Sequence, residues 1–260
     1  MRTIGAVVDA ANAPVLVECA VESLAGAYAA VVGGANRIEL CANLDAGGLT
    51  PSVGLCQAVS SAVQIPVFAM LRPRPGDFLY GADEVDVMVR DIEALREAGA
   101  HGFVVGALTA TGDIDSRRMA EFVDLADGLP ITCHRAFDLC RDGDEAIETL
   151  VELGVARVLT SGQAKSAYDG RLRLRDFVRR ADNRITVMAG AGVRGDTVER
   201  LVELTGVREV HLSAAGSRDS RMKFRREGVP MGATEVRDEY SVRTTEDVDV
   251  ARVVAALRRS

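Results

Sequence analysis

The segment GANRIELC at residues 34–41 is the first of four stretches that share one pattern. The others are GAHGFVVG at 99–106, GVARVLTS at 154–161 and GVREVHLS at 206–213. Each consists of a glycine, a small apolar residue, two variable positions and a short run typical of a β-strand. A helical pattern precedes each glycine, so the glycine is expected just past a helix end, in the left-handed conformation. The repeated unit is therefore a helix, a glycine and a strand.

Four more strands are predicted between helical segments, which brings the total to eight. They are PVLVEC at 14–19, PVFAMLR at 66–72, PITCHR at 130–135 and RITVMAG at 184–190. Apolar strands joined by helices indicate a parallel sheet covered on both faces, and eight such units fit a (β/α)8 TIM barrel. A doubly wound open sheet is the alternative, but no GxGxxG motif follows the first strand.

The barrel is expected to form one α/β domain over residues 14–260, after a flexible N-terminal lead over residues 1–13. The stretch at 217–245, between the eighth strand and the last helix, is unusually long and polar. It is interpreted as a functional loop, an oligomer contact or a partly ordered excursion. A non-catalytic scaffold that uses this stretch for dimer contacts is one hypothesis for the whole chain.

Composition excludes several classes of protein. The chain of 260 residues has a formal charge of −7 and a pI near 5.1, which argues against a nucleic-acid partner because such binding needs a basic face. No apolar run is long enough for a signal peptide or a membrane span. Five cysteines without a CxxC spacing favour reduced thiols over disulfides or structural zinc. We expect a cytoplasmic protein with no membrane partner.

Polar and small residues gather where the predicted strands end, which is the end at which TIM barrels carry their active sites. In chain order they are Glu18, Glu39, Cys41, Arg72, Arg74, His134, Arg135, Asp138, Thr160, Ser161, Gly190, Gly192 and Ser213. We expect these residues to converge around one cavity.

Arginines dominate one part of this set. Arg72 and Arg74 alternate with prolines, which fix the backbone, and Arg135 follows the fifth strand. A guanidinium grips a carboxylate or phosphate with two parallel hydrogen bonds, so the three arginines predict a small anionic ligand. The alternative is that Arg72 and Arg74 only neutralise the nearby carboxylates of Glu18, Glu39 or Asp77.

The turns after strands six to eight are rich in glycine and serine. Gly190, Gly192 and Ser213 follow strands seven and eight, where barrels commonly seat a phosphate on backbone N–H groups, and Ser161 after strand six is expected to help hold it. Any tight turn between a strand and a helix also recruits glycine, so this signal is moderate.

His134 and Asp138 form the best candidate for acid–base chemistry, with Glu18 or Glu39 as a partner base. The alternative is a buried polar network that closes the barrel top. His101 precedes its strand and is expected to be structural. His211 lies in mid-strand and is expected to be a hydrogen-bonded core histidine.

Five motifs taken together resemble the CutC family of copper homeostasis proteins. They are ANRIELCANLDAGGLTPSVG, RPRPGDFLY, CHRAFD, RVLTSG and VMAGAGV, and the resemblance extends over about residues 15 to 245. It implies a TIM barrel that is cytoplasmic, often dimeric, and in some members reported to bind Cu(I). The copper ligands that the resemblance implies are Cys19 and Cys41. Two positions depart from the family pattern: Ala20 follows Cys19, where some members carry a second cysteine, and Cys133 stands where an aromatic residue is usual.

Strand alternation complicates a copper site made from both cysteines. If Glu18 and Glu39 both point into the barrel, Cys41 shares the side of Glu39, whereas Cys19 points away from the side of Glu18. Two thiolates at one metal would then need a bulge or a frayed strand end. A buried Cys19 that acts as a small apolar residue is the alternative.

Two functions therefore remain open. One is a copper-homeostasis protein that binds Cu(I), with Cys19 and Cys41 as the ligands that the resemblance implies. The other is an enzyme that acts on a small phosphorylated or carboxylated metabolite at the barrel mouth, with no reaction specified. A homodimer is expected in either case, on the resemblance alone.

Overall fold

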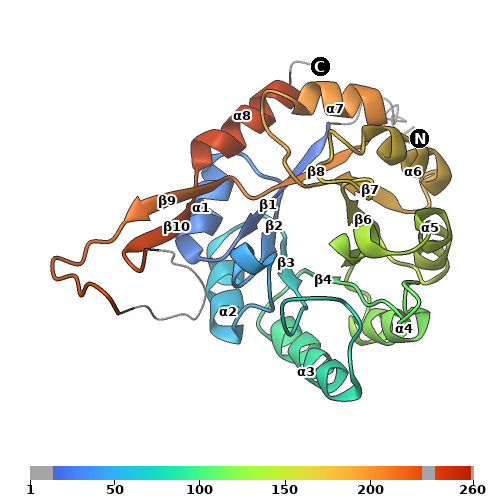
Figure 1. The fold of residues 1–260 in the computed structure, drawn as a ribbon, viewed down its shortest axis with the longest axis horizontal. Helices are drawn as coiled ribbons and strands as arrows, with labels where there is room; N and C mark the ends of the chain where they lie inside the picture. Colours follow the sequence, from blue (N-terminus) through green and yellow to red (C-terminus); the bar gives the residue numbers. More distant parts are fainter. Residues whose placement is uncertain (1–13, 230–237, 259–260) are drawn as a thin grey trace, which may run out of the picture.

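Eight parallel strands close into a barrel in the order of the sequence (Figure 1). The computed structural model describes residues 14–229 and 238–258. The strands of the barrel are β1 (Leu16–Val21), β2 (Arg37–Leu40), β3 (Val67–Met70), β4 (Gly102–Val105), β5 (Ile131–Cys133), β6 (Arg157–Thr160), β7 (Thr186–Ala189) and β8 (Glu209–Leu212). β1 pairs with both β2 and β8, so the sheet has no edge. The TIM-barrel prediction is confirmed, and the open-sheet alternative is wrong.

Helices surround the barrel on its outer side (Figure 1). They are α1 (Leu24–Val32), α2 (Val53–Ala62), α3 (Ala82–Glu97), α4 (Ser116–Leu125), α5 (Gly143–Glu152), α6 (Arg171–Ala181), α7 (Val198–Thr205) and α8 (Asp247–Leu257). Two short 3-10 helices, η2 (Leu44–Ala46) and η3 (Arg135–Leu139), follow β2 and β5.

The glycines of the four repeated segments have the predicted conformation. Gly34, Gly99, Gly154 and Gly206 all have positive φ, between 72° and 92°. A residue with a Cβ is strained there, so each glycine ends its helix and turns the chain into the next strand.

Strand alternation separates two kinds of interior. Outward residues of the strands, such as Ile38 and Phe103, pack with the helices in one large apolar cluster that includes Phe122 and Phe177. Inward residues fill the barrel, and many of them are charged. The site is built on this inner face.

The long polar stretch after β8 contains a hairpin. Strands β9 (Ala215–Asp219) and β10 (Ser241–Thr245) pair antiparallel and project from the barrel beside α1 (Figure 1). Arg243 ties the base of the hairpin to Asp45 at 2.7 Å. The expectation for residues 1–13 lies outside the described residues. Within the described ranges, no helix is long and apolar enough to cross a membrane.

Candidate functional site

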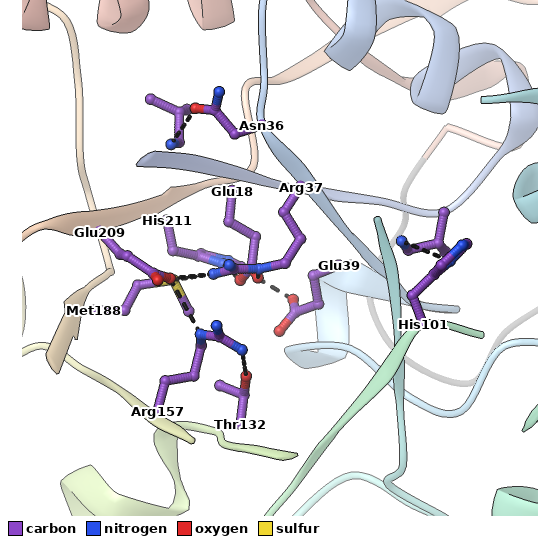
Figure 2. A network of polar contacts seen from close by, with 12 residues as sticks. Glu18, Asn36, Arg37, Glu39, His101, Thr132, Arg157, Met188, Glu209 and His211 are labelled. Carbon is purple, nitrogen blue, oxygen red and sulfur yellow. Dashed lines mark hydrogen bonds and ion pairs between the residues drawn. The ribbon is translucent and has the colours of Figure 1, made fainter. Parts of the chain in front are cut away.

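A layer of ion pairs lies deep inside the barrel. Arg37 binds both Glu18 and Glu209, and Arg157 binds Glu209 at 3.2 Å (Figure 2). The two guanidinium groups each lie 5.1 Å from the centroid of the Phe68 ring. Buried charges are costly unless they are paired and hydrogen-bonded, and here each has a partner of opposite charge.

The position of Glu18 corrects a sequence expectation. β1 continues to Val21 instead of ending near Cys19, so Glu18 lies in the middle of its strand. Its carboxylate is fully enclosed between Arg37 and His211 and does not line the cavity described below. Glu18 therefore holds Arg37 and His211 in place and does not face the cavity.

His211 joins this ion layer to Glu39. Its Nδ1 atom donates to Glu18 at 2.8 Å, and its Nε2 atom lies 3.7 Å from Glu39 Oε2 (Figure 2). His211 has the hydrogen bond expected of a core histidine, but its ring also lies on the cavity wall. The sequence did contain a signal for this position. Side chains two residues apart share one face of a strand, so His211 points inward with Glu209 and Ser213.

Protonation of these three groups is coupled through charge. Burial alone would raise the pKa of Glu18, but the hydrogen bond from His211 and the charge of Arg37 lower it to about 2. Burial would also lower the pKa of His211, yet the carboxylates of Glu39 and Glu18 raise it above its usual value. Burial, with the nearby charge of Glu18, raises the pKa of Glu39. One oxygen of Glu18, one of Glu39 and a nitrogen of His211 lie within 4.8 Å of one another, a spacing that suits a cation.

A cavity of about 1000 Å³ opens above this cluster, at the carboxyl ends of the strands. Of the residues predicted for the site, the structure places six on its wall: Glu39, Arg72, His134, Arg135, Gly192 and Ser213. His211, Met70 and the α8 residues Arg252 and Val253 also line it. The expected convergence of distant residues is therefore present for Glu39, Arg72 and His134.

Arg72 is held rigidly at the cavity wall. One terminal nitrogen donates to the carbonyls of Ala46 and Gly48, and the other donates to Gly76 O at 2.9 Å. The guanidinium carbon lies 4.9 Å from the centroid of the Phe78 ring. The Nε atom is buried and has no partner among the described residues. Arg72 thus joins the loop after β2 to the loop after β3 and keeps one N–H group unused.

His134 is fixed in one tautomer. The backbone N–H of Ala136 donates to His134 Nδ1 at 3.2 Å, which leaves the proton on Nε2. Burial and the charge of Arg72 lower the pKa of His134 to about 3, so the ring is neutral near pH 7. Its Nε2 atom is buried without a partner in the part of the chain described. His134 is therefore a hydrogen-bond donor at neutral pH and a poor base.

Arg74 points away from the cavity. Its guanidinium binds Glu84 and Asp77 and donates to the carbonyl of Leu79. The structure supports the alternative interpretation for this residue, in which the charge only neutralises nearby carboxylates.

Asp138 and Ser161 bind each other outside the cavity lining. Asp138 accepts hydrogen bonds from Thr160, from the backbone and hydroxyl of Ser161, and from Arg135. Asp138 therefore does not face His134, and the hydroxyl of Ser161 is already used. Gly190 is also absent from the cavity lining. It packs closely against Leu159 instead, because a Cβ added at this position would lie 2.4 Å from Leu159 Cδ1. Of the predicted phosphate residues only Gly192 and Ser213 face the cavity.

The two candidate copper ligands lie on opposite faces of the barrel wall. Cys19 belongs to the outer apolar cluster, and its thiol lies 3.8 Å from the carbonyl of Ala20. Cys41 belongs to a small inner cluster, and its thiol donates to Glu39 Oε2 at 3.5 Å. Burial raises the pKa of Cys19 to about 12 and that of Cys41 well above its usual value. The two strands pair in regular register over Glu18 to Val21, with none of the bulging that a shared ion would need.

Residues 15–216 match the sequence profile of the CutC family. The chain belongs to the CutC family. A copper homeostasis protein cutC homolog from Mus musculus is 47% identical over 94% of this chain and 89% of its own length. The Homo sapiens homolog of the same name is 45% identical with the same coverage.

A solved CutC structure from Streptococcus agalactiae has the same fold as this CutC chain. It is 32% identical, has a TM-score of 0.73, and the match covers 76% of this chain and 97% of the other. A thiamine phosphate pyrophosphorylase from Pyrococcus furiosus has a TM-score of 0.58 at 13% identity, which reflects the shared barrel alone.

Proposed function

We propose that this chain serves copper homeostasis by binding Cu(I) as cargo at the barrel mouth, with Cys41 as the principal ligand. The names of its mammalian relatives support the copper role. The observation that carries the site is that the Cys41 thiol and His211 Nε2 border the same oxygen, Glu39 Oε2, at 3.5 and 3.7 Å.

The donor set fits a soft cation better than a hard one. Thiolate, thioether and imidazole groups favour Cu(I), and Met70 packs with Cys41 in the inner cluster. Glu39 is placed to take the thiol proton when the metal binds and to release it into the cavity that it lines, because the thiol already donates to it. Cys19 is left out of this site, since it lies among the apolar residues of the outer layer.

Proton release gives the proposal a pH dependence. Burial and the charge of Glu39 raise the pKa of Cys41, so the thiol must lose a proton to become a ligand. Copper affinity should then rise with pH by up to about tenfold per pH unit, if one proton is released.

The experiment is an anaerobic Cu(I) competition titration against a chromogenic chelator. Wild type is compared with Cys41→Ser, Cys19→Ser and Cys56→Ser, the last being a buried cysteine on α2 far from the mouth. We expect Cys41→Ser to lose the bound equivalent and the other two variants to keep it. Unchanged stoichiometry and affinity in Cys41→Ser would reject the proposal.

Location and assembly are part of the same proposal. All five cysteines are unpaired and buried, which suits the reducing cytoplasm. The hairpin arm exposes Met222 and Phe224 at 60% and 64%, which suits contact with a second copy in a homodimer. Light scattering of wild type and Phe224→Ser tests assembly, and a monomeric wild type at micromolar concentration would exclude the dimer.

A further inference from the structure

Three buried polar atoms on the cavity wall have no partner in the described chain. They are Glu39 Oε1, Arg72 Nε and His134 Nε2. Their residues are 3%, 7% and 4% exposed. Buried polar atoms are almost always hydrogen-bonded, because leaving one unmatched forfeits its interaction with water. Three such atoms around one cavity indicate a ligand whose polar groups match them.

The three atoms divide into donors and an acceptor. Arg72 and His134 follow β3 and β5 and each offers one N–H group, from a guanidinium and from a neutral imidazole. Both side chains contact the Phe78 ring: the Arg72 guanidinium carbon and the His134 ring centroid each lie 4.9 Å from the Phe78 centroid. Glu39 extends from β2 toward His211 of β8, and its Oε1 atom offers an acceptor. The ligand must therefore present both an acceptor and a donor to the wall of the mouth.

Both donors are fixed before any ligand arrives. Arg72 is anchored by three backbone carbonyls, and His134 by the N–H group that it caps at the start of η3. Such prior ordering lowers the entropy lost on binding. The unused Nε–H group belongs to a permanently charged guanidinium, which favours an anionic acceptor.

We propose that the mouth binds a small organic acid that also carries a hydroxyl group. The carboxylate accepts from Arg72 Nε and His134 Nε2, and the hydroxyl donates to Glu39 Oε1. Arg135 also lines the cavity, but its guanidinium is paired with Asp138 at 2.7 Å, so the ligand charge is met by Arg72. A carboxylate is favoured over a phosphate because Ser161, one of the predicted phosphate-binding residues, is bound to Asp138 instead. This site uses neither Cys41 nor copper, although it shares Glu39 with the copper site proposed above.

The test is calorimetric titration of the full chain, without added copper, with named probes. The hydroxy acids are glycolate, L-lactate, L-malate and D-gluconate. Acetate lacks the hydroxyl, glycerol lacks the carboxylate, and inorganic phosphate replaces the acid. We expect at least one hydroxy acid to bind more tightly than acetate, glycerol and phosphate.

Two variants locate the binding. His134→Asn keeps an oxygen that can cap η3 but removes the Nε2 donor, because asparagine is a favoured N-cap residue. Glu39→Gln keeps the side-chain shape but replaces one acceptor oxygen of the carboxylate with an amide NH2 group. Each should weaken binding by about tenfold or more. His101→Asn is the matched control, since His101 accepts from Val67 N–H at the opposite end of the barrel. This variant should bind the hydroxy acid as tightly as wild type does.

The proposal is overturned if no hydroxy acid binds, if phosphate binds best, or if both variants bind as wild type does. His134→Asn should leave Cu(I) affinity unchanged, because His134 is not among the copper ligands proposed above. A loss of acid binding with copper retained therefore separates this site from the copper site.

Discussion

Arg37 and Ile38 are neighbours in β2, yet they belong to opposite faces of the barrel wall. Arg37 points inward and binds Glu18 and Glu209, while Ile38 points outward into the apolar cluster beneath the helices. The outer face holds the fold together by burying hydrocarbon. The inner face encloses charges whose cost is offset only by their partners. Fold and site are thus made by alternate residues of the same strands.

The largest loss of stability is expected when Arg37, the central cation of the inner face, is replaced. Arg37→Met leaves Glu18 and Glu209 buried beside a hydrocarbon chain, which should lower the free energy of unfolding by about 3–5 kcal/mol. Urea denaturation followed by circular dichroism measures the change. A loss below about 1 kcal/mol would show that the carboxylates find other partners or lose their charge.

The two histidines of the mouth, His134 and His211, should make stability depend on pH in opposite ways. Burial and Arg72 lower the pKa of His134 to about 3, whereas an unfolded histidine titrates near 6.5. Between these values the unfolded chain binds the extra proton, so stability falls as pH decreases. Between pH 6.5 and 5.0, wild type should lose about 2 kcal/mol more than His134→Asn. Denaturation curves at each pH measure this, and parallel curves for the two proteins would contradict a neutral buried ring.

His211 should show the opposite behaviour. Burial opposes its charge, but Glu39 and Glu18 raise its pKa, so its contribution is complete below pH 6.5 and is lost as pH rises through the raised value. Ring nitrogen chemical shifts at pH 6.5 should report His211 as cationic and His134 as neutral. Identical shifts for the two rings would remove the electrical distinction between the two sides of the mouth.

Repeats and strand periodicity were enough to predict the barrel, the helix-ending glycines and the convergence of Glu39, Arg72 and His134. Periodicity also separated Cys19 from Cys41 correctly, because side chains alternate across a strand whatever their neighbours are. It did not predict the ion layer, since Arg37, Arg157 and Glu209 stand at strand starts, which are usually polar for lack of burial. Whether such a charge points inward depends on pairing between distant strands.

Side-chain direction beyond the strands was the main source of error. Arg74 and Asp138 follow strand ends closely, but loop contacts turn Arg74 toward Glu84 and bind Asp138 to Ser161. At the start of α2, Ser52 is the N-cap of the helix that begins at Val53, and Thr50 binds the backbone of Arg72.

On the outer face, small changes of volume should have modest effects. Ile38→Val removes one methylene group from the fully buried side chain beside Arg37, and should cost about 1 kcal/mol. The same urea experiment compares it with Arg37→Met. An equal or larger loss for Ile38→Val would mean that outer packing, and not the inner ion layer, is the more sensitive face of β2.

The hairpin of β9 and β10 lies outside both faces of the barrel wall, so a substitution there should change the free energy of unfolding least. Val242 in β10 is 39% exposed and lies outside the barrel, so Val242→Ser should change the free energy of unfolding by less than about 0.5 kcal/mol. Its neighbour Arg243 still ties the hairpin base to Asp45, so the arm should keep its place. Dilute protein isolates the folding effect of the variant, and concentrated protein adds any contact between copies. A loss of stability that appears only at high concentration would assign the arm to assembly, whereas a loss at every concentration would show that the arm supports the barrel itself.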